Sequence, residues 1–452
     1  MVIGSLLLIS AGLYNGYPLV TSDTGTYLNS ALNLTVPDDR PITYGLFVLA
    51  TSLRFSLWIV IFIQGLLLAW LLLSYLSWLV PRLPAAGRLA IVGIVTWGTG
   101  VSWFCSQLMP DIFTAIGLLA LGLILLQPNI GGFKGWVLAL LLLISAIMHS
   151  SNLVTFSLTM GGIGLAVWRK RLFPRKVLAR SRFWLTCGLV GSAWILLPTV
   201  HAAFGGGFTL TRASPTFLVA RLVEAGVMDK FLSRNCGPEN NYQLCAFRDQ
   251  LPNDAIAFLW DGNSPLYKTG GWDANLPEYR RILHEIATTP RYYPYLASEL
   301  VQATLRQLTH VGLGDGLTAN RENTNPYWKV GELVSYELKE YMSSLQNRSA
   351  LSFDNSNERA YGSQLWALLL LTIGLGYSKI RQQLSPAVLL VITVFGLGIL
   401  SNALVTGGLA NILDRLQSRV AWLMPFGALL LTLPFALRLG THIWHQLRAK
   451  WV

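Results

Sequence analysis

The sequence predicts an all-α polytopic membrane protein with about ten transmembrane helices. Hydrophobic residues make up 53% of its 452 residues and charged residues only 12%, a composition too apolar for a water-soluble globule. Its apolar runs are also long enough to cross a hydrocarbon core of roughly 30 Å as helices. The predicted spans are 2–20, 55–80, 88–108, 111–127, 135–149, 151–168, 184–203, 363–378, 386–405 and 419–437.

The distribution of charge predicts the orientation of these spans. All 22 acidic residues can be placed on one side of the membrane, whereas 15 of the 34 lysines and arginines lie in short segments that contain no acid. Seven of these basic residues fall within 169–182. The positive-inside rule makes the basic side cytoplasmic, with both termini on that side. We therefore expect a multi-pass protein of a bacterial inner (plasma) membrane.

The same distribution argues against nucleic acid as a partner. The basic residues flank the predicted spans, where contact with anionic membrane lipid explains them. The first span lacks a clear cleavage site, so we expect a retained helix rather than a removed signal peptide.

Two segments are expected on the outer side. The first is a loop at 21–54, and the second is an extracytoplasmic domain at 204–362, which holds 17 of the 22 acids and is inserted after the seventh span. The domain separates an N-terminal transmembrane module, 1–203, from a C-terminal one, 363–452. We expect it to be mainly α, with helices at 215–233, 277–289, 292–312 and 327–345.

Cysteine usage supports the placement of this domain. Cys236 and Cys245 are close enough in sequence to close a short loop as a disulfide in an oxidising compartment. The alternative is a pair of buried thiols.

The five acids outside the domain are all predicted at the outer membrane boundary: Asp23, Asp38, Asp39, Asp111 and Asp414. Asp23 directly follows the first span, where it is either a helix N-cap or a general base or metal ligand. Asp111 follows Pro110 and opens the fourth span. It either interacts with the helix N-terminus or is functional, because an unpaired acid at membrane depth is costly.

Basic and polar residues at the same boundary are further candidates. Arg40 lies beside Asp38 and Asp39 between two prolines, which is either a solvated turn or a site for a metal or a sugar hydroxyl. Arg415 and Arg419 are four residues apart, so a helix would present both on one face, suited to a phosphate or to lipid headgroups. His149 ends the fifth span, as a hydrogen-bonded core residue or a substrate contact.

Several common motifs are absent from the sequence. It contains no Walker loop, dinucleotide-binding glycine fingerprint, His-Glu-x-x-His helix or nucleophile elbow. ATP-driven transport, zinc proteolysis and serine hydrolysis lose support accordingly.

An acid just after the first span, a second acid opening span four after a proline, many spans and a large outer domain together resemble the glycosyltransferase C superfold. That class includes protein mannosyltransferases, aminoarabinose transferases and oligosaccharyltransferases. The resemblance implies that Asp23 is the first-loop acid, acting as base or orienting the acceptor. It also implies that Asp111 is the second-loop acid, and that both would hold any divalent metal, Mg²⁺ or Mn²⁺. The acidic pair lies at Asp38-Asp39 rather than beside Asp23, so Asp39 is a third catalytic candidate.

The expected activity is transfer of a sugar from a polyprenyl-phosphate donor to a glycan, lipid or protein acceptor at the outer face, with inversion. Phosphate binding is expected at Arg40, Arg415 and Arg419. Substrate contacts are expected at Asp38, His149 and Asp414. The alternatives are a glycan ligase or polymerase that uses lipid-diphosphate donors, a lipid or sugar transporter, and a non-catalytic membrane subunit.

Overall fold

The computed structural model describes residues 1–126, 132–168, 178–237 and 242–450, and this part of the chain is helical with no β-strand. Five helical segments are long and apolar enough to cross a membrane. They are α5 (Leu57–Leu79), α10 (Ser150–Trp168), α11 (Arg180–Ala203), α22 (Pro386–Leu409) and the segment Asp414–Arg438 of α23 (Asp414–Ala421) and α24 (Leu423–Lys450). A helical membrane protein is therefore confirmed as the fold class.

The other five predicted spans are shorter, interrupted or more polar helices, so the count of ten remains a prediction. Residues 2–20 form α1 (Val2–Leu8) and α2 (Ser10–Asn15), and 88–108 is broken at Thr99 between α6 (Ala85–Gly98) and α7 (Val101–Cys105). The single spans expected there are wrong in detail. Spans four and five correspond to α8 (Ile112–Leu126) and α9 (Phe133–Met148), and 363–378 lies in α20 (Asp354–Gly376), which begins with charged residues.

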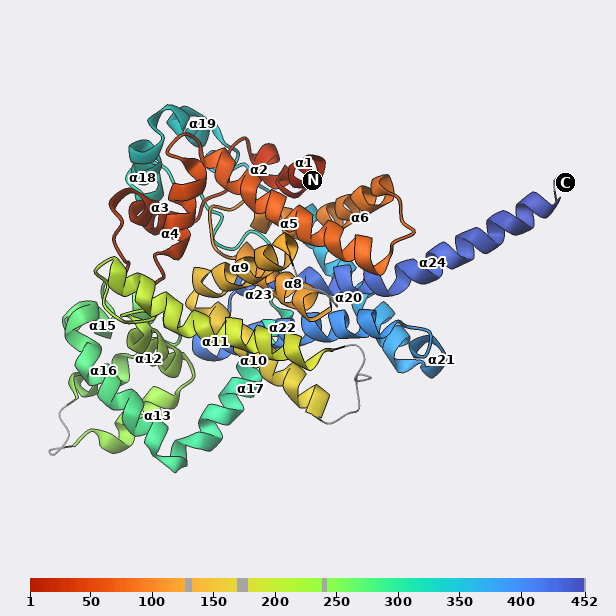
Figure 1. The fold of residues 1–452 in the computed structure, drawn as a ribbon. Coiled ribbons are helices and arrows are strands. Elements are labelled where there is room, and N and C mark those ends of the chain that lie inside the picture. The colour runs from red at the N-terminus through yellow and green to blue at the C-terminus, as the bar shows by residue number, and fades with distance from the viewer. Residues whose placement is uncertain (127–131, 169–177, 238–241, 451–452) are drawn as a thin grey trace.

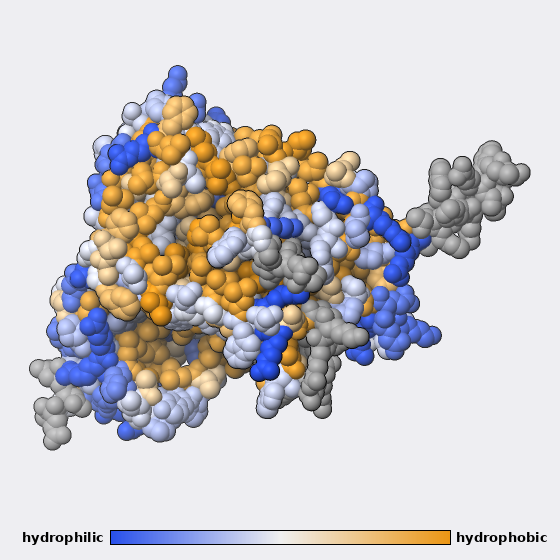
Figure 2. Space-filling model, viewed as in Figure 1, coloured by the Kyte–Doolittle hydropathy of each residue, from blue (hydrophilic) through white to orange (hydrophobic). Residues whose placement is uncertain are grey.

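The charged segments lie toward different ends of the helix bundle (Figure 1), and the side of the membrane that each end faces stays a prediction. In Figure 1 the α5–α6 connection, α21 (Ser378–Arg381) and the C-terminus lie toward one end of the bundle, and the outer segments lie toward the other. Part of the basic stretch, 169–177, falls outside the described residues. Figure 2 shows a broad hydrophobic surface over the helices between these hydrophilic ends.

The helices between the transmembrane modules agree in part with the prediction. The expected helix 215–233 is divided at Gly226, whose φ is +64°, into α12 (Ser214–Glu224) and α13 (Val227–Asn235). The remaining elements are the 3₁₀ helix η1 (Gln243–Gln250), α14 (Ala255–Trp260), α15 (Pro265–Lys268), α16 (Gly271–Thr288), η2 (Pro290–Tyr292), α17 (Tyr293–Thr309), α18 (Asn325–Leu333), η3 (Ser335–Glu337) and α19 (Leu338–Ser343). A Cys236–Cys245 disulfide follows α13 and closes the loop expected from the sequence.

The segment 204–362 is not one packed unit. Its first half has a core of its own, which includes Phe231, Phe258 and Tyr279. Its second half joins the core of the transmembrane helices, because the hydroxyl of Tyr17 donates to Glu337 (2.7 Å) and α18 packs on α3 (Thr24–Asn33). Together with α4 (Thr43–Ser52), α3 forms the first outer loop.

A close helix crossing fixes the outer helices on the membrane bundle. Helix α17 packs along α22 at Gly407, where an added Cβ would lie 2.7 Å from the carbonyl oxygen of Ala303. The buried side chain of Arg221 on α12 donates through Nε to the carbonyl of Gly407 (2.9 Å) and through Nη2 to Glu299 (2.7 Å). Glycine at this position thus allows the close crossing of α17 and α22.

Substitution of this glycine tests the crossing. We expect Gly407→Ala to lower stability by about 1–3 kcal/mol, because the added methyl group meets backbone atoms that have no room to move. The matched control is Gly396→Ala in the same helix, where a Cβ meets nothing within 4 Å and alanine improves helix propensity. Thermal unfolding in detergent measures both variants, and equal melting temperatures would contradict the packing.

Candidate functional site

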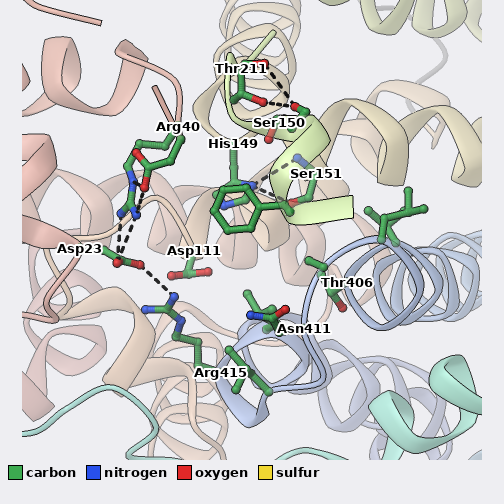
Figure 3. A pocket seen from close by; sticks show the side chains of 18 of the residues that line it. Asp23, Arg40, Asp111, His149, Ser150, Ser151, Thr211, Thr406, Asn411 and Arg415 are labelled. Atoms are coloured by element: carbon green, nitrogen blue, oxygen red, sulfur yellow. Dashed lines mark hydrogen bonds and ion pairs between the residues drawn. The ribbon is translucent and has the colours of Figure 1, made fainter. Parts of the chain in front are cut away.

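A cavity of about 860 Å³ lies where the outer loop, the outer helices and the transmembrane bundle meet. Its polar lining includes Asp23, Asp39, Arg40, Asp111, His149, Asp315 and Arg415, all but Asp315 from the residues expected at the membrane boundary. Figure 3 shows Asp23, Arg40, Asp111 and Arg415 grouped on one side, with Thr406 and Asn411 opposite. The cavity is the candidate site because it collects these side chains from distant parts of the sequence.

Backbone pairing holds the two acid-bearing loops together. The amide of Leu19 donates to the carbonyl of Ser106, and the amide of Leu108 donates to the carbonyl of Leu19, both at 2.9 Å. The buried amide of Gln64 on α5 donates to the carbonyls of Cys105 and Gln107. Asp23 and Asp111 follow these anchored segments by only a few residues, so their backbones are fixed beside each other.

Asp23 bridges two arginines. Its Oδ1 accepts from Arg40 (3.2 Å) and its Oδ2 accepts from Arg415 (2.9 Å), as Figure 3 shows. Asp23 occupies the N-cap position of α3, but its side chain makes no capping bond. Burial alone would raise the pKa of Asp23, but the charges and hydrogen bonds of Arg415 and Arg40 outweigh it and hold that pKa below the usual range. At neutral pH this carboxylate is charged and a weak proton acceptor.

The neighbouring acids differ in their surroundings. Asp39 accepts from Nε of Arg40 at 3.0 Å and lines the cavity. The guanidinium of Arg40 also lies 5.3 Å from the ring centroid of Tyr27. Asp38 points outward and pairs with Arg212 at 3.4 Å, both side chains being about 60% exposed. Asp39 therefore belongs to the cavity, whereas Asp38 belongs to an exposed rim.

Arg419 does not face the cavity, and its expected role as a phosphate ligand is not supported. Its side chain is fully buried, donates to Oδ1 of Asp111 at 3.0 Å and makes further hydrogen bonds to Asn402 and Ser151. The i, i+4 spacing does place Arg415 and Arg419 on one side of α23, but only Arg415 lines the cavity. A charge buried at this depth needs a partner, and Asp111 supplies it.

Two other candidates have different outcomes. His149 lines the cavity, and its Nδ1 accepts from the backbone N–H of Ser151 (3.2 Å), so a neutral ring carries its proton on Nε2. Asp414 lies instead against Gly312 and does not line the cavity, although its neighbours Leu413 and Arg415 do, so a substrate contact there is not supported.

Several residues of the site were not predicted from the sequence. Asp315 lines the cavity and accepts from the backbone N–H of Arg415 at 3.2 Å. It lies between Gly314 and Gly316, whose φ values are +100° and +75°. The Gly-Asp-Gly sequence could therefore have indicated a turn that presents this carboxylate. Ser151 and Asn402 carried no such signal, because each is an ordinary polar residue whose importance lies in contact with Arg419.

The donor set does not match a divalent-cation site. Both oxygens of Asp23 are occupied by guanidinium groups, and Asp111 is paired with Arg419. Among the described residues no cluster of three His, Cys, Asp or Glu side chains is arranged to hold a metal. We derive no step through a metal at these residues.

Comparisons with known protein families, curated proteins and solved structures find no match for this chain. Its function is therefore inferred from the site alone.

The buried Asp111–Arg419 pair and the exposed Asp38–Arg212 pair form a matched test. We expect Asp111→Asn to destabilise the protein by about 3–5 kcal/mol, because it leaves the guanidinium of Arg419 buried without its counter-charge. Asp38→Asn removes an exposed pair and should change stability by less than about 1 kcal/mol. Chemical or thermal unfolding in detergent measures the difference, and similar effects of the two variants would contradict the burial of Arg419.

The depressed pKa of Asp23 predicts that the stability contributed by its ion pairs is lost in strong acid. Its ion pairs contribute fully above the unfolded pKa of about 3.9 and are lost as pH falls through the lower folded value. The melting temperature of Asp23→Asn should therefore lie below that of the wild type by a constant amount between about pH 5 and 8, and the gap should narrow in stronger acid. Narrowing between pH 8 and 6 would mean that the pKa is raised.

Proposed function

We propose that this chain is an integral membrane glycosyltransferase that transfers a sugar from a polyprenyl-phosphate donor to an acceptor at the outer membrane face, with inversion. One observation carries the proposal: a single cavity combines a charged end with an apolar flank. That combination suits a ligand with an anionic head and a hydrocarbon tail.

The apolar flank of the cavity comes from three membrane-length helices and from α12. Its residues are Val154, Trp194, Phe217, Leu218, Val405 and Leu409, from α10, α11, α12 and α22. In Figure 2 the surface is hollowed between α11 and α12, on this side of the molecule. Three of these helices are long and apolar enough to cross a membrane, which supports a place for a prenyl tail beside them.

The charged end offers donors for a phosphate. Arg415 lines the cavity, and among the described residues its side chain donates only to Asp23 through Nη2, while its buried Nε has no partner. A guanidinium has five N–H groups, so several remain for phosphate oxygens. Arg40 donates to Asp23 and Asp39 and stands on the opposite side of Asp23. Asp23 holds both guanidinium groups in place.

The proposed reaction is a direct displacement. The acceptor hydroxyl oxygen attacks the anomeric carbon, the bond from that carbon to the phosphate oxygen breaks, and the polyprenyl phosphate leaves with the electron pair. Arg415 and Arg40 stabilise the charge on the leaving phosphate. A carboxylate takes the hydroxyl proton. Asp39 and Asp111 are better placed for this step than Asp23, because each uses only one oxygen in the hydrogen bonds found among the described residues.

Substitution of Arg415 tests the phosphate site. We expect Arg415→Ala to weaken the binding of undecaprenyl phosphate by at least about tenfold, because a charge-assisted hydrogen bond is lost from a partly buried site. The control is Arg212→Ala, whose exposed guanidinium pairs with Asp38 outside the cavity. Native mass spectrometry of the full chain in detergent measures both affinities.

A second readout separates an enzyme from a transporter or a non-catalytic subunit. With a polyprenyl-phosphate hexose as donor, the wild type should release free polyprenyl phosphate, and Arg415→Ala should release far less. Equal affinity of the wild type and Arg415→Ala for undecaprenyl phosphate would remove the phosphate role. Tight binding without any release of sugar from the wild type would favour the alternatives.

A further inference from the structure

A second hollow, of about 630 Å³, adjoins the candidate active site on the outer surface. Thr26, Asp39 and Trp260 line both spaces, so the two are neighbours with a common wall. Asp39 is the only carboxylate among the described residues that lines both. The hollow therefore leads from solvent to a carboxylate of the candidate site.

Two tryptophans form an aromatic surface in this hollow. The side chain of Trp260 is 52% exposed, and its ring centroid lies 5.4 Å from that of Trp272. The ring of Phe217 packs behind Trp272 at 5.5 Å. The rings come from α12, α14 and α16, and Phe217 and Trp272 pack against the core of these helices. Trp272 is half-buried, so the two rings present a partly exposed aromatic surface beside a cavity, which is typical of a binding face.

The polar lining of the hollow indicates which ligands it accepts. Its charged residues are Asp38, Asp39 and Asp273, and no lysine or arginine lines it. Hydrogen-bonding groups of Asn29 and Thr35 complete the wall. Carboxylates accept hydrogen bonds from hydroxyl and amino groups and repel anions. The apolar faces of sugar rings pack on indole rings, while their hydroxyl groups meet the carboxylates.

We propose that this hollow is the acceptor subsite and that it binds a neutral or amine-bearing glycan on the Trp260–Trp272 surface. The proposal rests on the proposed transferase function, because it assigns the second substrate of the same site. A glycan seated there would direct its reacting hydroxyl toward Asp39. The subsite selects against anionic glycans because, of its three lining carboxylates, Asp38 pairs with Arg212 and Asp39 with Arg40, whereas Asp273 has no ion pair among the described residues and leaves a net negative charge.

Saturation-transfer NMR on the purified full chain tests the subsite with three hexasaccharides: a neutral glucan, a glucosamine oligomer and a galacturonate oligomer. We expect the first two to bind and the third to bind at least about tenfold more weakly. Trp260→Ala and Trp272→Ala should each weaken binding about tenfold, as the loss of one aromatic platform does. Trp260→Phe keeps a ring and should retain most of the affinity.

The matched control is Trp328→Ala. Trp328 is a similarly exposed tryptophan of an outer helix, 54% exposed on α18, and lines neither space. Its substitution should leave glycan binding unchanged. The proposal is overturned if the wild type binds none of the three hexasaccharides, if galacturonate binds as well as glucan, or if Trp260→Ala and Trp272→Ala bind as the wild type does.

Failure of this proposal is distinguishable from failure of the transferase proposal. Undecaprenyl phosphate binding depends on Arg415 and should be retained in Trp272→Ala, because Trp272 lines the second hollow and not the cavity. Phosphate-lipid binding without hexasaccharide binding would remove the acceptor subsite alone. Hexasaccharide binding without phosphate-lipid binding would remove the donor, and with it the transferase.

Discussion

The ion pairs of Asp23 with Arg40 and Arg415 join the first outer loop to a helix almost 400 residues later, and the candidate site depends on them. Charged groups at a membrane boundary are costly unless they are paired, so each arginine of the site needs a carboxylate. The carboxylates come from the first outer loop and from the start of α8, whereas two of the arginines come from α23. These ion pairs therefore hold the first outer loop and the start of α8 against α23 around the cavity.

The two arginines of α23, Arg415 and Arg419, have different roles. Arg419 is enclosed by Asp111, Asn402 and Ser151 and acts as a structural charge. Arg415 keeps unused N–H groups beside a cavity with an apolar side, and the proposed anionic lipid would use both features. The depressed pKa of Asp23 is consistent with a holding role, since a carboxylate between two guanidinium groups is a poor base. Proton transfer in the proposed reaction then falls to Asp39 or Asp111.

Much of this site was predictable because charge is rare in an apolar chain. Only five acids lie outside the segment 204–362, and three of them, Asp23, Asp39 and Asp111, line the cavity. The burial of Arg419 was not predictable. The spacing of Arg415 and Arg419 shows that they share a helix face, but it does not show which of them is buried against a partner. Nor was the division of 204–362, because its second half joins the core of the transmembrane helices through contacts such as Tyr17–Glu337, which have no pattern in the sequence. Asp315 was hidden among the 17 acids of that segment, although its flanking glycines marked a turn.

The central claim is that a lipid-linked phosphate occupies this cavity with its tail along the apolar flank. The most direct measurement is photo-crosslinking of the full chain in lipid nanodiscs with a polyprenyl phosphate that carries a diazirine in its first isoprene units, followed by peptide mass spectrometry. The account predicts crosslinks to the flank residues Trp194, Leu218 and Leu409. Crosslinks confined to exposed positions of the spans, such as Trp184 or Leu400, with none in the flank, would contradict it.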